Sequence, residues 1–147
     1  MGESGRKFIE DNFNWNKMAL NKLPNNFMKK YRKNFSDEYY FYNIVRYETP
    51  SIDFIKENII NIDIRYLIKY QQLPEDFIIN DLNLRNKIIM EDICMFQKLS
   101  DNFLLKNYYI VSFSAIAKNK KMTSFDHESF KNKYWKQLKY SKINWNK

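Results

Sequence analysis

The side chains best able to do acid–base or metal chemistry are few and widely separated in this 147-residue sequence. His127 is the only histidine, between Asp126 and Glu128, and Cys94, the only cysteine, lies 33 residues before it. Zinc sites and most acid–base mechanisms combine a histidine with further histidine, cysteine or carboxylate groups. We therefore interpret His127 as an exposed residue near a helix start. Cys94 lies in an apolar-periodic segment and is interpreted as a small buried side chain.

Carboxylate pairs and glycines also give no catalytic pattern. In a helix the side chains of adjacent residues such as Glu75 and Asp76 point about 100° apart, so they do not converge as a catalytic pair would. The only glycines, Gly2 and Gly5, precede the expected folded region. This excludes glycine-rich phosphate loops and dinucleotide fingerprints. The sequence indicates a protein that is not an enzyme, with no cofactor and no metal.

A run of aromatic residues is the first candidate for binding. Tyr39, Tyr40, Phe41 and Tyr42 are consecutive, so they cannot all face inward from one helix. Partly exposed tyrosines often anchor protein partners, because the ring is apolar and the hydroxyl is polar. We predict that partner-binding residues come from Tyr39, Tyr40 and Tyr42.

Basic residues near the two ends are the second candidate. The net charge is +8, but residues 12–36 hold six cations and no acid, and residues 118–147 hold nine lysines against two acids. Lysines beside aromatic rings such as Trp135 suit contacts with phosphates and stacked bases. The alternative is an ordinary solvated surface rich in lysine and asparagine. The predicted nucleic-acid contacts are Lys29, Lys30, Arg32, Lys33, Lys118, Lys120, Lys121, Lys131, Lys133, Lys136, Lys139 and Lys142.

A recurring five-residue phrase marks the elements that must position these candidates. Three copies contain the only prolines, at 23–27, 50–54 and 73–77, and a fourth at 99–103 has Ser100 instead. The phenylalanines that end the copies are 27, 23 and 26 residues apart, a recurrence typical of repeat arrays. Pro24, Pro74 and Ser100 suit a helix start, since the first helical turn needs no amide hydrogen and a hydroxyl can cap it.

Helical stripes precede the phrases. Apolar residues recur nine, six, five and three positions before each later copy, and this spacing predicts an α-helix of about three turns. The stripes are Phe41, Ile44, Val45 and Tyr47; Ile64, Leu67, Ile68 and Tyr70; and Met90, Ile93, Cys94 and Phe96, with a shorter form at Trp15, Met18 and Leu20.

The predicted fold is all-α, with short helix–turn–helix repeats stacked into a small solenoid-like or globular array. We expect an N-terminal lead-in at 1–12, a repeat domain at 13–130 and a basic C-terminal helix or tail at 131–147. A polar helix from about 127 to 142 would run into that tail. The repeat units are centred near Phe27, Phe54, Phe77 and Phe103, with a degenerate unit at Phe130.

Residues 70–78 and 96–104 resemble the short Leu-Ser/Pro-Glu-x-Phe-Ile repeats of uncharacterised proteins from giant DNA viruses and large phages. The resemblance spans about residues 15 to 130. Ile64 and Met90 stand where those repeats prefer tryptophan, and Pro50 replaces leucine. The resemblance implies a viral origin and an α-helical interaction role, and it transfers no functional residue.

Two classes of function follow. The first is a non-enzymatic viral interaction protein that binds, and in one form inhibits, a host protein or nucleoprotein complex, such as a bacterial defence system if the source is a phage. The alternative is an RNA or single-stranded DNA binding protein that uses its basic ends. A helical subunit of a nucleoprotein assembly would share features of both.

We expect a soluble protein in the host cytoplasm. Its expected partner is a host or viral protein, and we expect no association with a membrane. The longest charge-free run, residues 107–117, is far shorter than the ~20 apolar residues of a membrane-spanning helix. The first residues contain no apolar signal region.

Overall fold

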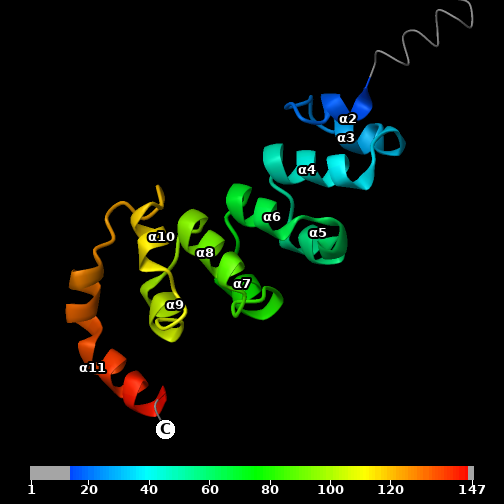
Figure 1. Ribbon diagram of the computed structural model, residues 1–147. Coiled ribbons are helices and arrows are strands. Elements are labelled where there is room, and N and C mark those ends of the chain that lie inside the picture. The colour runs from blue at the N-terminus through cyan, green and yellow to red at the C-terminus, as the bar shows by residue number, and fades with distance from the viewer. Residues whose placement is uncertain (1–13, 146–147) are drawn as a thin grey trace, which may run out of the picture. The chain divides into compact units, whose positions relative to one another are not determined.

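The computed structural model describes residues 14–145, with side chains through Lys139 (Figure 1). Within that range the chain is helical and forms no strand, which confirms the predicted all-α class. The predicted lead-in at 1–12 lies outside the described residues. Contacts divide the chain into two units, with the boundary after Gln71. Each unit is described by itself.

The first unit is built around its longest helix, α4 (Asp37–Tyr47). This helix packs against α3 (Phe27–Lys30), η2 (Ile59–Asn61) and α6 (Ile64–Tyr70). The unit also contains α2 (Trp15–Met18), η1 (Arg32–Asn34) and α5 (Ile52–Glu57). Ile44 and Val45 of α4 and Leu67 of α6 are buried in this unit.

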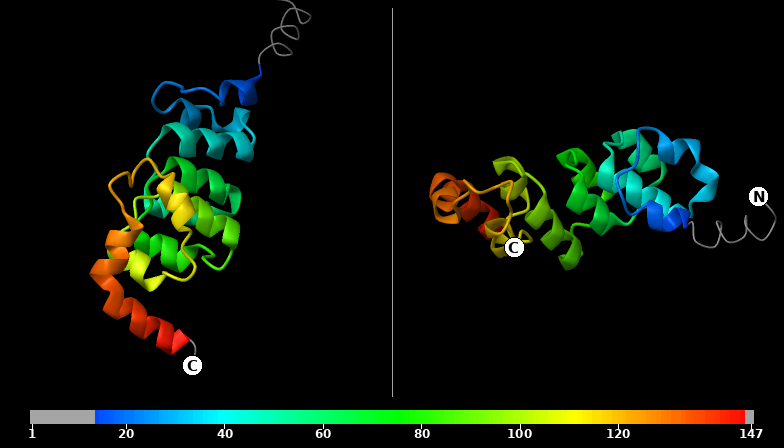
Figure 2. Two further views of the ribbon diagram at one scale, coloured as in Figure 1. Left: turned by 60° about the vertical axis from the view of Figure 1, so that its left-hand side comes forward. Right: turned by 90° about the horizontal axis from the view of Figure 1, so that it is seen from above.

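The second unit contains two packed helix pairs. Helix α8 (Lys87–Phe96) packs against α10 (Phe113–Ala117), and α9 (Asp101–Lys106) packs against α11 (His127–Trp145). Helix α7 (Glu75–Asp81) precedes them. Helix α11 bends at Tyr134, whose φ of −115° and ψ of 17° are not helical, and Figure 2 shows the two segments that meet there.

The helices predicted before the three later phrases are confirmed in position, although α6, with seven residues, is about two turns long instead of three. Helices α4, α6 and α8 cover the three stripes, and Ile44, Leu67 and Ile93 are buried in them. The shorter stripe is confirmed only in part, because α2 ends at Met18 and Leu20 beyond it is 45% exposed. The polar helix predicted from about 127 to 142 corresponds to α11.

Three of the four phrases start a helix. Pro74 is the N-terminal cap of α7. The hydroxyls of Ser51 and Ser100 accept hydrogen bonds, each at 3.1 Å, from the backbone N–H of Phe54 and Phe103. These contacts satisfy amide groups that the first turn leaves open.

The first phrase is an exception, so the helix start predicted at Pro24 is wrong. Here a turn comes first, closed by the Phe27 N–H, which donates to the Pro24 carbonyl oxygen at 3.1 Å. Asn26 has a φ of 64°, in the left-handed region that asparagine tolerates better than most residues. Helix α3 therefore begins only at Phe27.

A recurring amide side chain connects the end of one helix to a later helix or turn, a contact that the sequence does not predict. In the first unit, Asn43 Nδ2 donates to two carbonyl oxygens just after α2, at 2.6 and 2.8 Å. Gln71 Nε2 donates to two carbonyl oxygens at the C-terminal end of α4, at 2.6 and 2.7 Å. These carbonyls lie in the last turn of a helix or just beyond it, where no backbone N–H of the same helix is available, so the amides supply the missing hydrogen bonds.

The second unit repeats this arrangement. Asn119 Nδ2 donates to the carbonyl oxygens of Cys94 and Gln97, at 2.8 and 2.7 Å. Gln97 Oε1 accepts from the Leu73 backbone N–H at 2.8 Å. Asn43, Gln97 and Asn119 are the buried polar residues of the described chain, so the buried polar positions all lie in this set of contacts.

Candidate functional site

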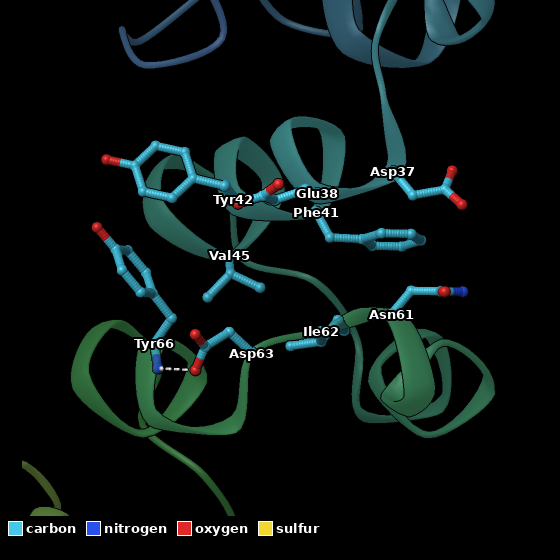
Figure 3. Close-up of a pocket in the computed structure, with 9 residues that line it drawn as sticks. All are labelled: Asp37, Glu38, Phe41, Tyr42, Val45, Asn61, Ile62, Asp63 and Tyr66. Carbon is cyan, nitrogen blue, oxygen red and sulfur yellow. Dashed lines mark hydrogen bonds between the residues drawn. The ribbon is translucent and has the colours of Figure 1, made fainter. Parts of the chain in front are cut away.

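The first unit contains a pocket of about 300 Å³ between α4 and the segment that runs from η2 into α6 (Figure 3). Side chains from the two segments face one another across it, as Figure 3 shows. The lining residues are Asp37, Glu38, Phe41, Tyr42 and Val45 from the first segment, and Asn61, Ile62, Asp63 and Tyr66 from the second. We call this the Tyr42–Tyr66 pocket.

Helical spacing explains which residues reach the pocket. Glu38, Tyr42 and Val45 are four and three residues apart on α4, so they share one face of the helix. Phe41, Val45 and Ile62 are buried and form an apolar inner wall. The pocket thus combines an apolar wall with carboxylates and phenols from the same two segments.

Asp63 fixes the second side of the pocket. Its Oδ1 accepts the backbone N–H groups of Arg65 and Tyr66 at 2.9 and 3.2 Å, which caps α6. This bond to Tyr66 is drawn as a dashed line in Figure 3. The cap holds one carboxylate beside the pocket and fixes the direction in which α6 starts.

Two tyrosines form the aromatic part of the pocket. The ring centroids of Tyr42 and Tyr66 lie 4.9 Å apart with an interplanar angle of 60°, and Tyr70 lies 5.0 Å beyond Tyr66. A hydrogen bond with the Tyr42 side chain is the main reason why the pKa of Tyr66 is raised. The Tyr66 phenol is therefore uncharged near neutral pH and can donate a hydrogen bond.

The charges around the pocket are negative. Asp37 forms an ion pair with Arg32, which lies outside the lining. Glu38 is exposed, and its side chain forms neither an ion pair nor a hydrogen bond with any other residue that the structure describes. No lysine or arginine lines the pocket. The Glu38 carboxylate is thus available to an incoming group.

The predicted tyrosines separate into different environments. Tyr42 is half-buried and lines the pocket, and Tyr39 is half-buried on the same helix. Tyr40 is buried, packs edge-on against Phe41 at 5.1 Å, and has a raised pKa because of its burial. The role predicted for Tyr40 as an exposed anchor is therefore wrong, because its ring belongs to the core.

The sequence analysis missed Tyr66 and the three carboxylates of the pocket. A signal for Tyr66 was present, because Tyr66 and Tyr70 are four residues apart and so share a helix face. No comparable signal marked Glu38, since acids in the first turn of a helix are common for electrostatic reasons.

The N-terminal basic residues do not form one free cluster. Arg32 is held within the unit: its guanidinium carbon lies 4.0 Å from the Tyr40 ring centroid, and it pairs with Asp37. Lys29, Lys30 and Lys33 are exposed. The structure thus leaves three of the four predicted contacts in this region at the surface.

The basic residues of the second unit are also partly engaged. Lys131 pairs with Glu128 at 3.5 Å, and Lys133 lies 3.7 Å from Asp101. A hydrogen bond with Tyr134 is the main reason why the pKa of Lys133 is raised. These two lysines are partly neutralised along the first segment of α11.

The loop before α11 carries the remaining predicted lysines of that region. Lys118, Lys120 and Lys121 are exposed. Lys121 Nζ donates to Gln72 Oε1 at 3.2 Å, and partial burial lowers its pKa.

Two lysines of α11 lie around an exposed tryptophan. Lys136 Nζ and Lys139 Nζ are each 5.9 Å from the Trp135 ring, and Trp135 is 54% exposed. The structure therefore brings together two of the predicted nucleic-acid contacts with an accessible aromatic ring. The side chain of Lys142 lies outside the described residues.

A second pocket, of about 330 Å³, lies between the start of α9 and the start of α11. Apart from Lys98, most of its charged groups already have side-chain partners in the unit. Lys133 contacts Asp101, Lys121 contacts Gln72, and the Asp126 carboxylate accepts from both the backbone and the hydroxyl of Ser129. This pocket offers fewer available groups than the Tyr42–Tyr66 pocket.

His127 is not the exposed residue that the sequence suggested. It is half-buried and stacks on the Phe113 ring at 3.7 Å, and its Nε2 lies 3.1 Å from the Tyr108 hydroxyl. Burial is the main cause that lowers its pKa. Tyr108 and Phe113, which precede α11 in the sequence, pack against the imidazole and make it part of the core.

Cys94 is buried, as predicted. Burial raises the pKa of its thiol to about 11, and its Sγ accepts the Ser112 N–H at 3.4 Å. Across residues 14–139 no group of three or more histidine, cysteine, aspartate or glutamate side chains is placed to hold a metal ion. None of the helices described here is both long and apolar enough to cross a membrane.

Comparisons with protein families, curated proteins and solved structures give no match for this chain. The candidate site is therefore interpreted from its own geometry, which is that of an aromatic pocket with an available carboxylate.

Proposed function

We propose that this chain is a non-enzymatic interaction protein that binds a partner protein through the Tyr42–Tyr66 pocket. The observation that supports the proposal is the pocket itself, where two phenol rings and the Glu38 carboxylate stand at an apolar wall. Aromatic side chains in a pocket are the groups that most often dominate protein–protein binding energy. A partner that covers them would remove this apolar surface from water.

Ile60 extends the proposed binding surface. It is 94% exposed in η2 and directly precedes Asn61, which lines the pocket. Single exposed apolar residues are common, but here the residue adjoins an apolar pocket. The two together fit the apolar centre of an interface, with Glu38 and Asp63 in its polar rim.

The proposed origin is viral, and the proposed place of action is the host cytoplasm. The support is the resemblance of residues 70–78 and 96–104 to viral repeats. In this proposal the partner is a host protein or nucleoprotein complex, such as a bacterial defence system for a phage source, and binding inhibits it. The genes beside the coding sequence test this origin: replication, virion or defence-related neighbours support it, and a cellular operon contradicts it.

Affinity capture tests the binding function. Tagged wild-type protein in host lysate should recover one protein in stoichiometric amount, identified by mass spectrometry. The double variant Tyr42→Ala, Tyr66→Ala should lose it, while Tyr109→Ala, at an exposed tyrosine of the second unit, should retain it. Circular dichroism verifies that both variants are folded. Equal recovery by the two variants would contradict a role for the pocket.

A second candidate function is favoured by the lysines around Trp135. RNA or single-stranded DNA could stack a base on this ring while Lys136 and Lys139 contact phosphates. A subunit of a nucleoprotein assembly would use the same surface.

Fluorescence anisotropy with a labelled single-stranded oligonucleotide tests this second candidate. Changing Lys136, Lys139 and Lys142 to Glu should abolish binding. A control with the same net charge changes Lys56, Lys87 and Lys106, three exposed lysines on other helices. Equal losses in both variants would show that only overall charge matters and would remove this candidate.

A further inference from the structure

We propose that the Tyr42–Tyr66 pocket binds the guanidinium group of an arginine side chain in a basic segment of the partner protein. The inference rests on the proposed function, since it states which chemistry the pocket recognises. It is carried by three observations: the charges of the lining, the two tyrosine rings, and the way in which this unit holds its own arginines.

The charges of the lining select a cation. Asp37, Glu38 and Asp63 line the pocket, and no basic residue does. Asp37 already pairs with Arg32, and Asp63 accepts two backbone N–H groups of α6. Glu38 is thus the lining carboxylate with both oxygens open to a ligand, whereas Asp37 and Asp63 each use Oδ1 within the unit. A guanidinium suits it, because its planar array of donors can make two parallel hydrogen bonds to one carboxylate.

The tyrosines supply a second contact for the same group. A cation within about 6 Å of an aromatic ring is attracted by the negative face of the ring, and arginine is found there more often than lysine. The rings of Tyr42 and Tyr66 lie at 60° to each other, so they offer faces in two directions. The buried wall of Phe41, Val45 and Ile62 fits the aliphatic stem of an arginine.

The unit already holds two of its own arginines in this manner. The guanidinium carbon of Arg32 lies 4.0 Å from the Tyr40 ring centroid, and that of Arg46 lies 4.0 Å from the Tyr70 ring centroid. The guanidinium of Arg32 also contacts a carboxylate, because it forms an ion pair with Asp37. An arginine placed between Glu38 and Tyr66 would repeat this combination of ring and carboxylate.

Size and overall charge restrict the occupant further. A volume of about 300 Å³ is at the lower limit for ligand pockets, which suits one side chain better than a whole cofactor. The chain carries a net charge of +8, so general attraction does not bring a basic segment to it. Selection of arginine therefore depends on the pocket itself.

The test uses peptide probes and does not need the partner. Uniformly labelled protein is titrated with a short glycine- and serine-based peptide that carries one arginine, and the backbone amide signals are followed by NMR. Signals of residues 37–45 and 61–66 should shift. The same peptide with citrulline, which has the shape of arginine but no charge, should bind about tenfold more weakly.

Two variants separate the pocket from general charge effects. Glu38→Gln should weaken arginine-peptide binding about fivefold. Glu57→Gln removes the same charge from an exposed position on α5, outside the pocket lining, and should leave binding unchanged. Tyr66→Leu keeps an apolar side chain at position 66 and should also weaken binding. A wild-type-like spectrum of each free variant verifies its fold.

Several outcomes would overturn the inference. These are equal binding of the citrulline peptide, equal binding of a lysine peptide, shifts outside the pocket segments, and no shift with the arginine peptide. Any of them would leave the proposed function standing if partner capture still depends on Tyr42 and Tyr66. Conversely, arginine-peptide binding with no captured partner would count against the proposed function alone.

Discussion

Single amide side chains connect successive helices of this protein. Asn43, Gln71 and Asn119 each donate two hydrogen bonds to carbonyl oxygens near the end of an earlier helix. These residues were not predictable from one sequence. Asparagine is frequent throughout this chain, and asparagine and glutamine side chains are mostly exposed in folded proteins. Only the packing of the helices shows which amides are buried.

Asn119→Leu should destabilise the protein by about 2–4 kcal/mol, because two buried carbonyl oxygens would lose their donor. Urea unfolding measures the change. Asn132→Leu, the same substitution at an exposed position of α11, should change the free energy of unfolding by less than about 0.5 kcal/mol. Equal changes in the free energy of unfolding for the two variants would contradict a stabilising role for the hydrogen bonds of the Asn119 amide.

Tyr40 shows a residue that the sequence could have placed better. It precedes Ile44 by four residues, as Phe41 precedes Val45, and all four side chains are buried. The run of consecutive aromatic residues suggested that Tyr40 is exposed. The buried stripe on α4 is wide enough to include Tyr40, so its ring is buried. The same stripe leaves Tyr42 at its edge, where the pocket lies.

His127 gives a prediction for pH dependence. Its pKa is lowered from the usual 6.5, mainly by burial, so the unfolded chain binds a proton at a pH where the folded chain does not. The stability of the folded state is complete above 6.5 and decreases as the pH falls through this region. Thermal unfolding at a series of pH values measures this decrease.

His127→Phe is the matched control for that measurement. It keeps an aromatic ring to stack on Phe113 but cannot titrate. Its stability should depend less on pH than that of the wild type in the range just below 6.5. Equal slopes for the two proteins would contradict the burial of the neutral imidazole.

At the scale of elements, the recurring five-residue phrase marks the start of three short helices, α5, α7 and α9, and its phenylalanine is buried in α7 and α9. Helices α4, α6 and α8 were predictable because their apolar residues follow a spacing of three and four. The start of α3 was not, because it depends on the left-handed conformation of Asn26, which the residue type permits but does not require.

Phe77→Ala should lower the free energy of unfolding by about 3–5 kcal/mol. The side chain is only 3% exposed, so its removal leaves a cavity where α7 packs against the core. Phe54→Ala changes the same phrase position in the first unit, where the ring is only half-buried, and should cost less. Chemical unfolding of both variants provides the comparison. A smaller cost at Phe77 than at Phe54 would contradict the assignment of Phe77 as a core anchor.

At the scale of the whole molecule, the all-α class was predictable because the stripes repeat along the chain. The division after Gln71 was not, because it falls inside the string Tyr70-Gln71-Gln72-Leu73 with no change of composition. The pocket was also not predictable from the sequence, because Tyr42 and Tyr66 come together only when α4 and α6 pack against each other.

The charge distribution separates the two proposed surfaces of the molecule. Carboxylates line the Tyr42–Tyr66 pocket, which disfavours nucleic acid there, whereas lysines surround Trp135 on α11. A protein partner at the first surface and a nucleic acid at the second are therefore distinguishable by position.

Site-specific photo-crosslinking in cells that express the protein tests the central claim most directly. A benzophenone amino acid at position 60, beside the pocket, should give a covalent adduct with one protein, and Tyr66→Leu in the same chain should abolish it. A probe at position 135 is the positional control. Adducts only from position 135, or nucleic acid as the captured species at position 60, would contradict the account.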